Sequence, residues 1–211
     1  MIGIIDYGMG NLRSVQKALQ FVGANARIIT APEQTLPDKL VLPGVGAFAD
    51  GMIHLRRHGW IPYLQQFLDT QRPLLGICLG MQLLFQGSEE DASPGQLVPG
   101  LAILPGTVVR FQENSCPPKR LKVPHMGWNT LNWSRPDPLL QGLAPGDAMY
   151  FVHSYFVKPE EHADQPLTSA TCSYGRPFTA TVWRNNIWAT QFHPEKSQRL
   201  GLRILKNFST L

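Results

Sequence analysis

The sequence predicts an α/β fold: a mixed, mainly parallel sheet with helices on both faces and an antiparallel extension. In residues 2–85, short apolar runs alternate with stretches of helical spacing, which is typical of parallel strands joined by crossover helices. Beyond residue 105 the chain consists mainly of strand-like segments separated by turn signals such as Pro105-Gly106 and Asn185-Asn186. Such segments favour antiparallel pairing.

The elements of the first half follow from apolar spacing. Residues 2–6 form an apolar run of strand type, and the next stretch has helical periodicity, with Asn11 placed to cap its start and Gly23 its end. The apolar positions of this helix are Leu12, Val15, Leu19 and Val22. Further strands are expected at 26–29, 40–42 and 74–77, and further helices at 48–55, 62–68 and 80–85.

In the second half, strands are expected at 107–111, 148–156, 168–174, 179–183 and 187–192. A last helix carries apolar residues on one face and is expected to pack back onto the sheet. These residues are Leu200, Ile204, Leu205 and Phe208. Because no linker divides the chain, residues 1–211 are expected to form one domain.

Composition excludes several classes of function. Nineteen basic and fifteen acidic residues leave a net charge of +4 without a Lys/Arg block, which does not favour nucleic acid binding. No apolar run approaches the ~20 residues needed to cross a membrane, and Met1 leads directly into a strand rather than a secretory signal. Cys78, Cys116 and Cys172 are odd in number and lack a Cys-x-x-Cys pair. A protein of the reducing cytoplasm is therefore expected.

The segment Gly76-Ile77-Cys78-Leu79-Gly80 has the spacing of a nucleophile elbow, with sulfur in place of oxygen. A strand ends, a reactive side chain follows and a helix begins, so glycine on either side would give clearance at a sharp turn. The helix N-terminus would favour thiolate over thiol. The alternative is a buried core cysteine, and that structural interpretation is preferred for Cys116 and Cys172.

A cysteine nucleophile needs a base and a group that orients the base. His193 follows a predicted strand and precedes Pro194-Glu195. In an extended segment, residues two apart point the same way, so Glu195 would lie beside the imidazole. A surface His-Glu pair remains an alternative. His153 is a rival base, but it has no acidic neighbour and is better interpreted as a pocket-wall or core histidine.

Two further patterns resemble ligand sites. His54 and His58 share a helix face as a possible metal pair, although no third ligand is suggested and solvated surface is the better interpretation. Gly8 to Asn11 imitates a dinucleotide-binding turn, but Arg13 occupies its third glycine position.

The segment Pro43-Gly44-Val45-Gly46 is a strand running into a glycine loop. Acyl transfer passes through a tetrahedral oxyanion, and each backbone N–H aimed at it contributes about 3 kcal/mol. The N–H of Leu79 is one predicted donor, and the loop from Gly44 to Gly46 is predicted to supply the second. Taken alone, Pro-Gly-x-Gly is an ordinary turn.

Taken together, these motifs resemble those of the class I (triad) glutamine amidotransferases over essentially the whole chain. The order Cys78, His193, Glu195 carries the resemblance, which implies a flavodoxin-like fold. Within the class, the chain is similar to the family of glutaminase subunits of imidazole glycerol phosphate synthase. The segments that carry this closer match are 6–11, 43–46, 76–85, 87–90, 124–129, 150–155 and 191–197.

The resemblance implies that Cys78 attacks the side-chain amide of L-glutamine, forms a glutamyl thioester and releases ammonia, without metal or cofactor. The residues implied around the glutamine are Gly44, Gly46, Leu79, Gln82, Glu90, Ser154 and Tyr155. Two other readings stay open: a cysteine peptidase or deglycase on a related fold, for which His-Pro-Glu is not expected, and a catalytically silent interaction module.

The resemblance also implies a partner. No synthase domain is recognisable in the sequence, so the ammonia is expected to pass to a (β/α)₈-barrel cyclase subunit in a heterodimer of histidine biosynthesis. The residues implied on the face turned toward the cyclase are Asn11, Met126, Trp128, Tyr150 and Lys196, with core packing as the alternative for Trp128. The isolated chain is expected to be a poor glutaminase until the loaded partner binds.

Overall fold

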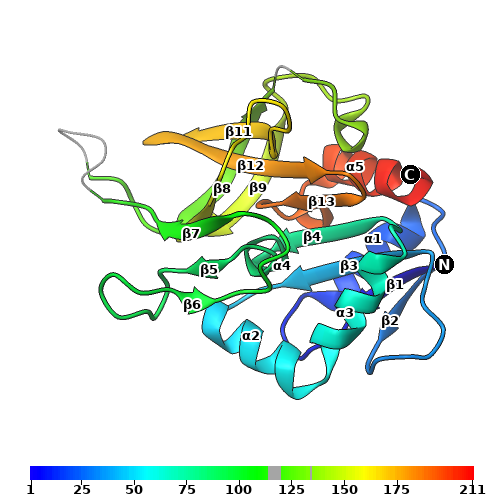
Figure 1. Cartoon of the computed structure of the whole chain (residues 1–211). Helices are drawn as coiled ribbons and strands as arrows, with labels where there is room; N and C mark the ends of the chain where they lie inside the picture. Colours follow the sequence, from blue (N-terminus) through cyan, green and yellow to red (C-terminus); the bar gives the residue numbers. More distant parts are fainter. Residues whose placement is uncertain (114–119, 134) are drawn as a thin grey trace.

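A computed structural model describes residues 1–113, 120–133 and 135–211 (Figure 1). Cys116 lies outside the described residues. Within them, one large sheet contains β1 (Ile2–Ile5), β2 (Ala26–Ile29), β3 (Lys39–Gly44), β4 (Leu74–Cys78), β8 (His125–Asn132), β9 (Ala148–His153), β11 (Thr168–Tyr174), β12 (Arg176–Arg184) and β13 (Ile187–Thr190).

The large sheet is parallel over one half and antiparallel over the other. Its order is β2-β1-β3-β4-β13-β12-β11-β8-β9. The strands from β2 to β13 pair in parallel, in the order that flavodoxin-like sheets adopt. From β13 onward every pairing is antiparallel. The predicted mixed sheet with an antiparallel extension is confirmed.

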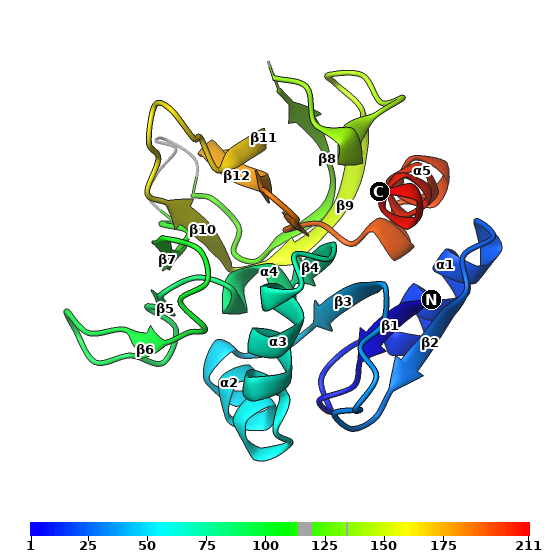
Figure 2. The same cartoon turned by 45° about the vertical axis from the view of Figure 1, so that its right-hand side comes forward.

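Helices cover both faces of the parallel strands. On one side lie α1 (Leu12–Phe21) and α5 (Gln198–Thr210), and on the other α2 (Phe48–Arg57) and α3 (Trp60–Asp69) (Figure 2). Neighbouring residues of β3 show why this strand reads as a continuous apolar run. Val41 and Leu42 are both fully buried, but they belong to different core clusters, because successive side chains of a strand point to opposite faces.

A second, smaller sheet joins β5 (Gly87–Ser88), β6 (Val98–Pro99), β7 (Gly106–Arg110) and β10 (Tyr155–Pro159) in the order β10-β7-β5-β6. The prediction of one continuous strand over 148–156 is wrong. The chain breaks at Ser154, where it leaves β9 in the large sheet and enters β10 in the small one. The carbonyl of Ser154 accepts a hydrogen bond from the backbone N–H of Phe111 at 3.0 Å.

Other local predictions differ in detail. The sequence pattern does not reveal β8, because its inward positions His125 and Asn129 are polar while Met126 and Trp128 point outward. Asn11 occupies the residue before α1 but makes no capping hydrogen bond through its side chain. Gly23 follows the end of α1 with a φ of +85°, as predicted. The short helices are α4 (Leu79–Leu83), η1 (Pro138–Leu140) and η2 (Pro194–Lys196).

Candidate active site

Cys78 sits at the sharp turn between β4 and α4. Its φ of 54° and ψ of −109° lie in a region that non-glycine residues rarely adopt. A Cβ added at Gly80 would lie 1.8 Å from the carbonyl oxygen of Leu42, and one added at Gly76 would lie 3.0 Å from that of Gly80. The flanking glycines therefore provide the clearance that the sequence pattern predicts.

Gly80→Ala is expected to lower the free energy of unfolding by about 3 kcal/mol, because the new methyl group overlaps backbone rather than a movable side chain. Urea unfolding measures the effect. Gly10→Ala is the matched control, since a Cβ there meets first the tip of the flexible Leu12 side chain at 3.2 Å. An unchanged unfolding midpoint for Gly80→Ala would refute this account of the turn.

His193 and Glu195 form a buried pair just beyond β13. His193 Nδ1 lies 2.8 Å from Glu195 Oε1, and the two side chains are 2% and 1% exposed. The prediction that an extended segment aligns them is wrong, because residues 194–196 form the helical turn η2. Pro194 opens this turn, and the hydroxyl of Ser197 donates to the carbonyl of His193 at 2.6 Å. The turn carries Glu195 back to the imidazole.

The surroundings of His193 favour the imidazolium. Burial by itself lowers the pKa of this ring, but nearby Cys78 and Glu195 outweigh burial and raise the pKa to about 10. Its Nε2 atom is buried and makes no hydrogen bond to another described residue. The ring therefore carries a proton on both nitrogens at neutral pH.

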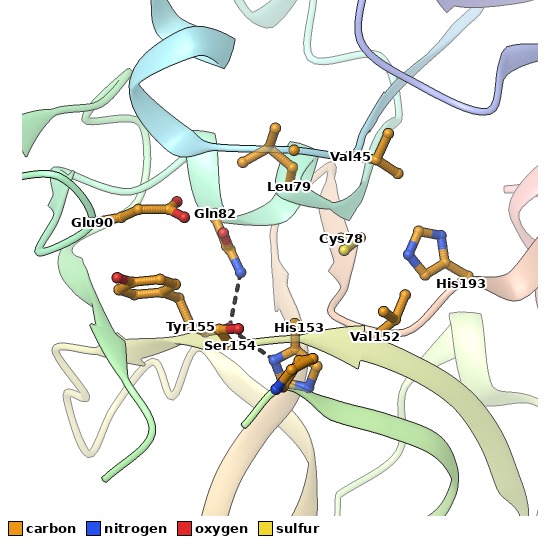
Figure 3. A pocket seen from close by; sticks show the side chains of 12 residues that line it. Val45, Cys78, Leu79, Gln82, Glu90, Val152, His153, Ser154, Tyr155 and His193 are labelled. Carbon is orange, nitrogen blue, oxygen red and sulfur yellow. Dashed lines mark hydrogen bonds between the residues drawn. The ribbon is translucent and has the colours of Figure 1, made fainter. Parts of the chain in front are cut away.

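Cys78 and His193 both line one cavity of about 320 Å³ (Figure 3). This volume suits a small ligand. The lining residues are Val45, Gly46, Cys78, Leu79, Gln82, Glu90, Pro124, Val152, His153, Ser154, Tyr155 and His193. Two residues of the predicted triad and oxyanion loop, Gly44 and Glu195, do not line the cavity themselves. Gly44 ends β3 in register with Cys78, and Glu195 supports His193 from behind.

Beside Cys78, the N–H of Leu79 belongs to the first turn of α4, where backbone donors have no acceptor within the helix. Gly46 has a φ of +104°, and its neighbour Val45 is 39% exposed. Both residues line the same cavity as Cys78. The structure thus brings both predicted donor segments beside the sulfur.

Gln82 and Glu90 present hydrogen-bond acceptors in the cavity. Nε2 of Gln82 donates to the carbonyl of Tyr155 at 3.0 Å and to Oε1 of Gln191 at 3.1 Å, so both of its N–H groups are used and Oε1 remains. Glu90 accepts from the N–H of Phe48 at 2.8 Å. Burial raises the pKa of Glu90, and the bond from Phe48 partly offsets that effect. Two acceptors at one end of a cavity suit an ammonium or amide donor.

Gln191 is a further residue beside Cys78, and no motif in the sequence predicts a role for it. Its side chain is fully buried, and its Nε2 lies 3.7 Å from the sulfur of Cys78. It lies just beyond β13, which ends at Thr190, and two residues before His193. Only the fold brings Gln191 to Cys78.

His153 is not the base. Its Nδ1 lies 2.8 Å from the carbonyl of Tyr155, and its Nε2 lies 3.0 Å from Nδ1 of His125. Burial lowers the pKa of His153 to about 3, so the ring is neutral and both nitrogens are engaged. Of the two interpretations that the sequence allows, a base or a residue of the pocket wall, the structure supports the second, because His153 lines the cavity.

The residues expected at a partner interface include two exposed apolar side chains. Met126 and Trp128 are 63% and 49% exposed, so core packing is excluded for Trp128 in this chain. The rings of Trp128 and Tyr150 lie 6.0 Å apart, and Nζ of Lys196 lies 5.9 Å from the centre of the Tyr150 ring. Asn11 is half-buried at the start of α1.

The possible metal pair His54 and His58 does not form a metal site among the described residues. His54 Nδ1 lies 2.9 Å from the carbonyl of Tyr7, and the exposed His58 lies 2.9 Å from the carbonyl of His54. Across residues 1–113, 120–133 and 135–211, no three His, Cys, Asp or Glu residues are grouped to hold a metal ion. Over the same ranges, every helix is too short or too polar to span a membrane.

The fold and the site define the class. A family model described as glutamine amidotransferase class-I matches residues 3–210, and the chain belongs to that family. It is 54% identical to the imidazole glycerol phosphate synthase subunit HisH of Syntrophotalea carbinolica over 100% of both chains. It is 49% identical to the subunit of the same name from Desulfitobacterium hafniense, over 99% of this chain and 93% of the relative. Within its class, the chain is therefore a member of the HisH family.

Solved structures agree on the fold. The structure titled PurLQS from Thermotoga maritima matches 98% of this chain and 94% of its own with a TM-score of 0.68, at 15% identity. A crystal structure titled glutamine amidotransferase matches 100% and 99% with the same TM-score, at 19% identity. At these identities the likeness concerns the fold alone.

Proposed function

We propose that this chain is the glutaminase subunit of imidazole glycerol phosphate synthase. It hydrolyses L-glutamine to glutamate and ammonia and passes the ammonia to a (β/α)₈-barrel cyclase subunit in the cytoplasm. There the ammonia is used to make imidazole glycerol phosphate and aminoimidazole carboxamide ribotide for histidine biosynthesis. The observation that carries the proposal is the joint placement of Cys78 and the Glu195-supported His193 in one cavity of a HisH-family chain.

In the proposed mechanism, the Cys78 thiolate attacks the side-chain carbonyl carbon of glutamine. Negative charge develops on the carbonyl oxygen, where the N–H of Leu79 and the loop from Gly44 to Gly46 stabilise it. As the intermediate collapses, the C–N bond breaks and the His193 imidazolium gives its proton to the leaving nitrogen, which departs as ammonia. A glutamyl thioester on Cys78 remains.

Hydrolysis of the thioester reverses these roles. Neutral His193 removes a proton from water, the hydroxide oxygen bonds to the thioester carbon, and the C–S bond breaks. The thiolate returns, the proton stays on the imidazole, and glutamate leaves. Glu195 keeps Nδ1–H of the ring in place throughout, so that Nε2 faces the reaction in both halves.

Glutamine recognition is assigned to the acceptors on the far side of the cavity. Oε1 of Gln82 and the carboxylate of Glu90 would accept hydrogen bonds from the α-ammonium group of the substrate. Ser154 and Tyr155 line the same wall because the chain switches sheets there. The substrate amide would then lie toward Cys78.

The proposed interface with the cyclase is the surface formed by Asn11, Met126, Trp128, Tyr150 and Lys196. Exposed Met and Trp side chains are typical of the centres of protein interfaces. Ammonia released into water at neutral pH would be protonated and lost, so a partner seated at the cavity mouth is required to receive it.

Glutamate release by the purified chain tests the proposal directly. Alone, the chain is expected to be a slow glutaminase, and addition of the cyclase with its bound nucleotide substrate is expected to raise the rate at least about tenfold, a typical size for coupling between sites. Cyclase turnover supported by an ammonium salt serves as the control for an active partner. Absence of glutamate release beside an ammonium-competent cyclase would contradict the proposed function.

A further inference from the structure

We propose that His125 and His153 are positioning residues for glutamine, through a chain of hydrogen bonds that joins strand β8 to the cavity wall at Tyr155 and Gln82. The inference rests on the proposed function, because its readout is the affinity for glutamine. Neither histidine contacts the reacting atoms; each acts through the groups that it holds.

At its outer end, this series of hydrogen bonds fixes which nitrogen of His125 donates and which accepts. Nδ2 of Asn129 donates to the carbonyl of Ser173 at 2.9 Å, while Oδ1 of Asn129 accepts from the N–H of Thr130 at 2.8 Å. The amide orientation is therefore set. Nδ2 also lies 3.2 Å from Nε2 of His125, which must accept. Neutral His125 then carries its proton on Nδ1 and donates toward His153.

The inner end imposes the same direction independently. The carbonyl oxygen of Tyr155 can only accept, so Nδ1 of His153 donates to it at 2.8 Å. Nε2 of His153 is left as the acceptor for Nδ1 of His125, 3.0 Å away. The two ends agree on one proton order, and a second proton on either ring would set N–H against N–H.

The environment keeps both rings neutral. Phe178 packs against both imidazoles, with ring centres 5.7 Å from His125 and 5.2 Å from His153, and Phe111 lies 5.3 Å from His153. This burial lowers the pKa of His125 to about 4 and that of His153 to about 3. The donor–acceptor order therefore persists throughout the neutral pH range.

The carbonyl of Tyr155 passes the constraint to the glutamine site. It accepts from His153 and also from Nε2 of Gln82 at 3.0 Å. The second N–H of Gln82 reaches Gln191, whose own Nε2 lies 3.7 Å from the sulfur of Cys78. The position of the Tyr155 carbonyl thus decides that Gln82 presents its oxygen, rather than its nitrogen, to the substrate.

The opposite face of β8 connects this series of hydrogen bonds to the proposed cyclase interface. His125 and Asn129 point inward, whereas Met126 and Trp128, between them in sequence, point outward into the proposed cyclase interface. One short strand therefore carries both the docking side chains and the start of the hydrogen-bond chain. A shift of β8 on docking would move the imidazoles and, through them, the acceptor offered to glutamine.

The test uses the full chain in complex with the nucleotide-loaded cyclase. His153→Leu and His125→Leu remove the hydrogen bonds while filling the space. His153→Asn keeps a donor near Nδ1 for the Tyr155 carbonyl, and His125→Asn keeps the corresponding donor for His153. Phe178→Leu is the packing control, because it weakens the contacts of both imidazole rings and leaves the hydrogen bonds from Asn129 to Gln82 in place.

The Leu variants are expected to raise KM for glutamine by about tenfold, whereas the Asn variants stay within about threefold of the original chain. Phe178→Leu is expected to lower the thermal midpoint without moving KM by more than about twofold. Folded Leu variants with an unchanged KM, or Asn variants as impaired as Leu, would overturn the inference. Loss of glutamine turnover in the unmodified complex would instead overturn the proposed function.

Discussion

Cys78→Ala is expected to abolish glutamine-dependent synthesis by the complex, with a loss of about 10⁴-fold or more, as for removal of a catalytic nucleophile. The methyl group cannot form the thioester, whereas the fold should tolerate it because Cys78 already occupies a strained turn lined by glycines. The same complex is expected to turn over normally with an ammonium salt, because the cyclase then receives ammonia directly. Paired assays with glutamine and with ammonium measure both quantities.

Cys172→Ala provides the matched control. Cys172 is buried and free, and burial raises the pKa of its thiol to about 12, so it is a structural rather than a reactive cysteine. Its variant is expected to retain glutamine-dependent turnover. If Cys78→Ala retained glutamine-driven activity, the sulfur would have no place in the mechanism, whatever the geometry of the turn.

The nucleophile turn could be predicted from sequence because its signal, a cysteine with a glycine on either side after a buried strand, is local. The backbone that Gly80 must clear is nevertheless distant in sequence, since it is the carbonyl of Leu42 in β3. The signal of the His193-Pro194-Glu195 segment is local as well, although its geometry is a helical turn rather than an extended one. Periodicity could not distinguish these, since proline is compatible with the start of a helix as well as with extended chain.

The opposite wall of the cavity could not be predicted in the same way. The apolar and aromatic residues of 148–156 indicate a strand, but they do not show that the chain changes partner at Ser154 and enters a second sheet. Strand β8 has its polar residues His125 and Asn129 directed inward, which reverses the pattern expected of a half-buried strand. Both features depend on hydrogen bonds between residues far apart in sequence, and a single sequence does not display those.

The order of strands in the large sheet explains why Cys78 and His193, which were predicted separately, lie close together. Strands β4 and β13 are parallel neighbours, with Ile77 in register with Thr190. Cys78 follows the first of these residues and His193 comes three positions after the second, so both leave the same edge of the sheet. In open parallel sheets, functional side chains gather at the carboxyl ends of the strands.

Glu195→Gln is expected to lower glutamine-dependent kcat/KM by about 10² to 10⁴-fold, as for comparable triad changes. The substitution preserves shape and keeps an Oε1 acceptor for Nδ1–H of His193, 2.8 Å away. It removes the negative charge, which is one of the causes of the raised pKa of His193. The variant therefore has less imidazolium to protonate the leaving ammonia.

The pH dependence separates this effect from a loss of structure. In the original chain the pKa of His193 is raised to about 10, so the imidazolium is present at neutral pH and is lost as pH rises through that value. In Glu195→Gln the pKa falls, so activity is expected to decline at a lower pH on the alkaline side. Glu33→Gln is the control, because Glu33 pairs with Arg27 and does not line the cavity that holds Cys78 and His193. If the Glu195→Gln variant kept a near-normal kcat/KM and an unchanged alkaline side of its pH–activity profile, the charge of Glu195 would have no role in catalysis.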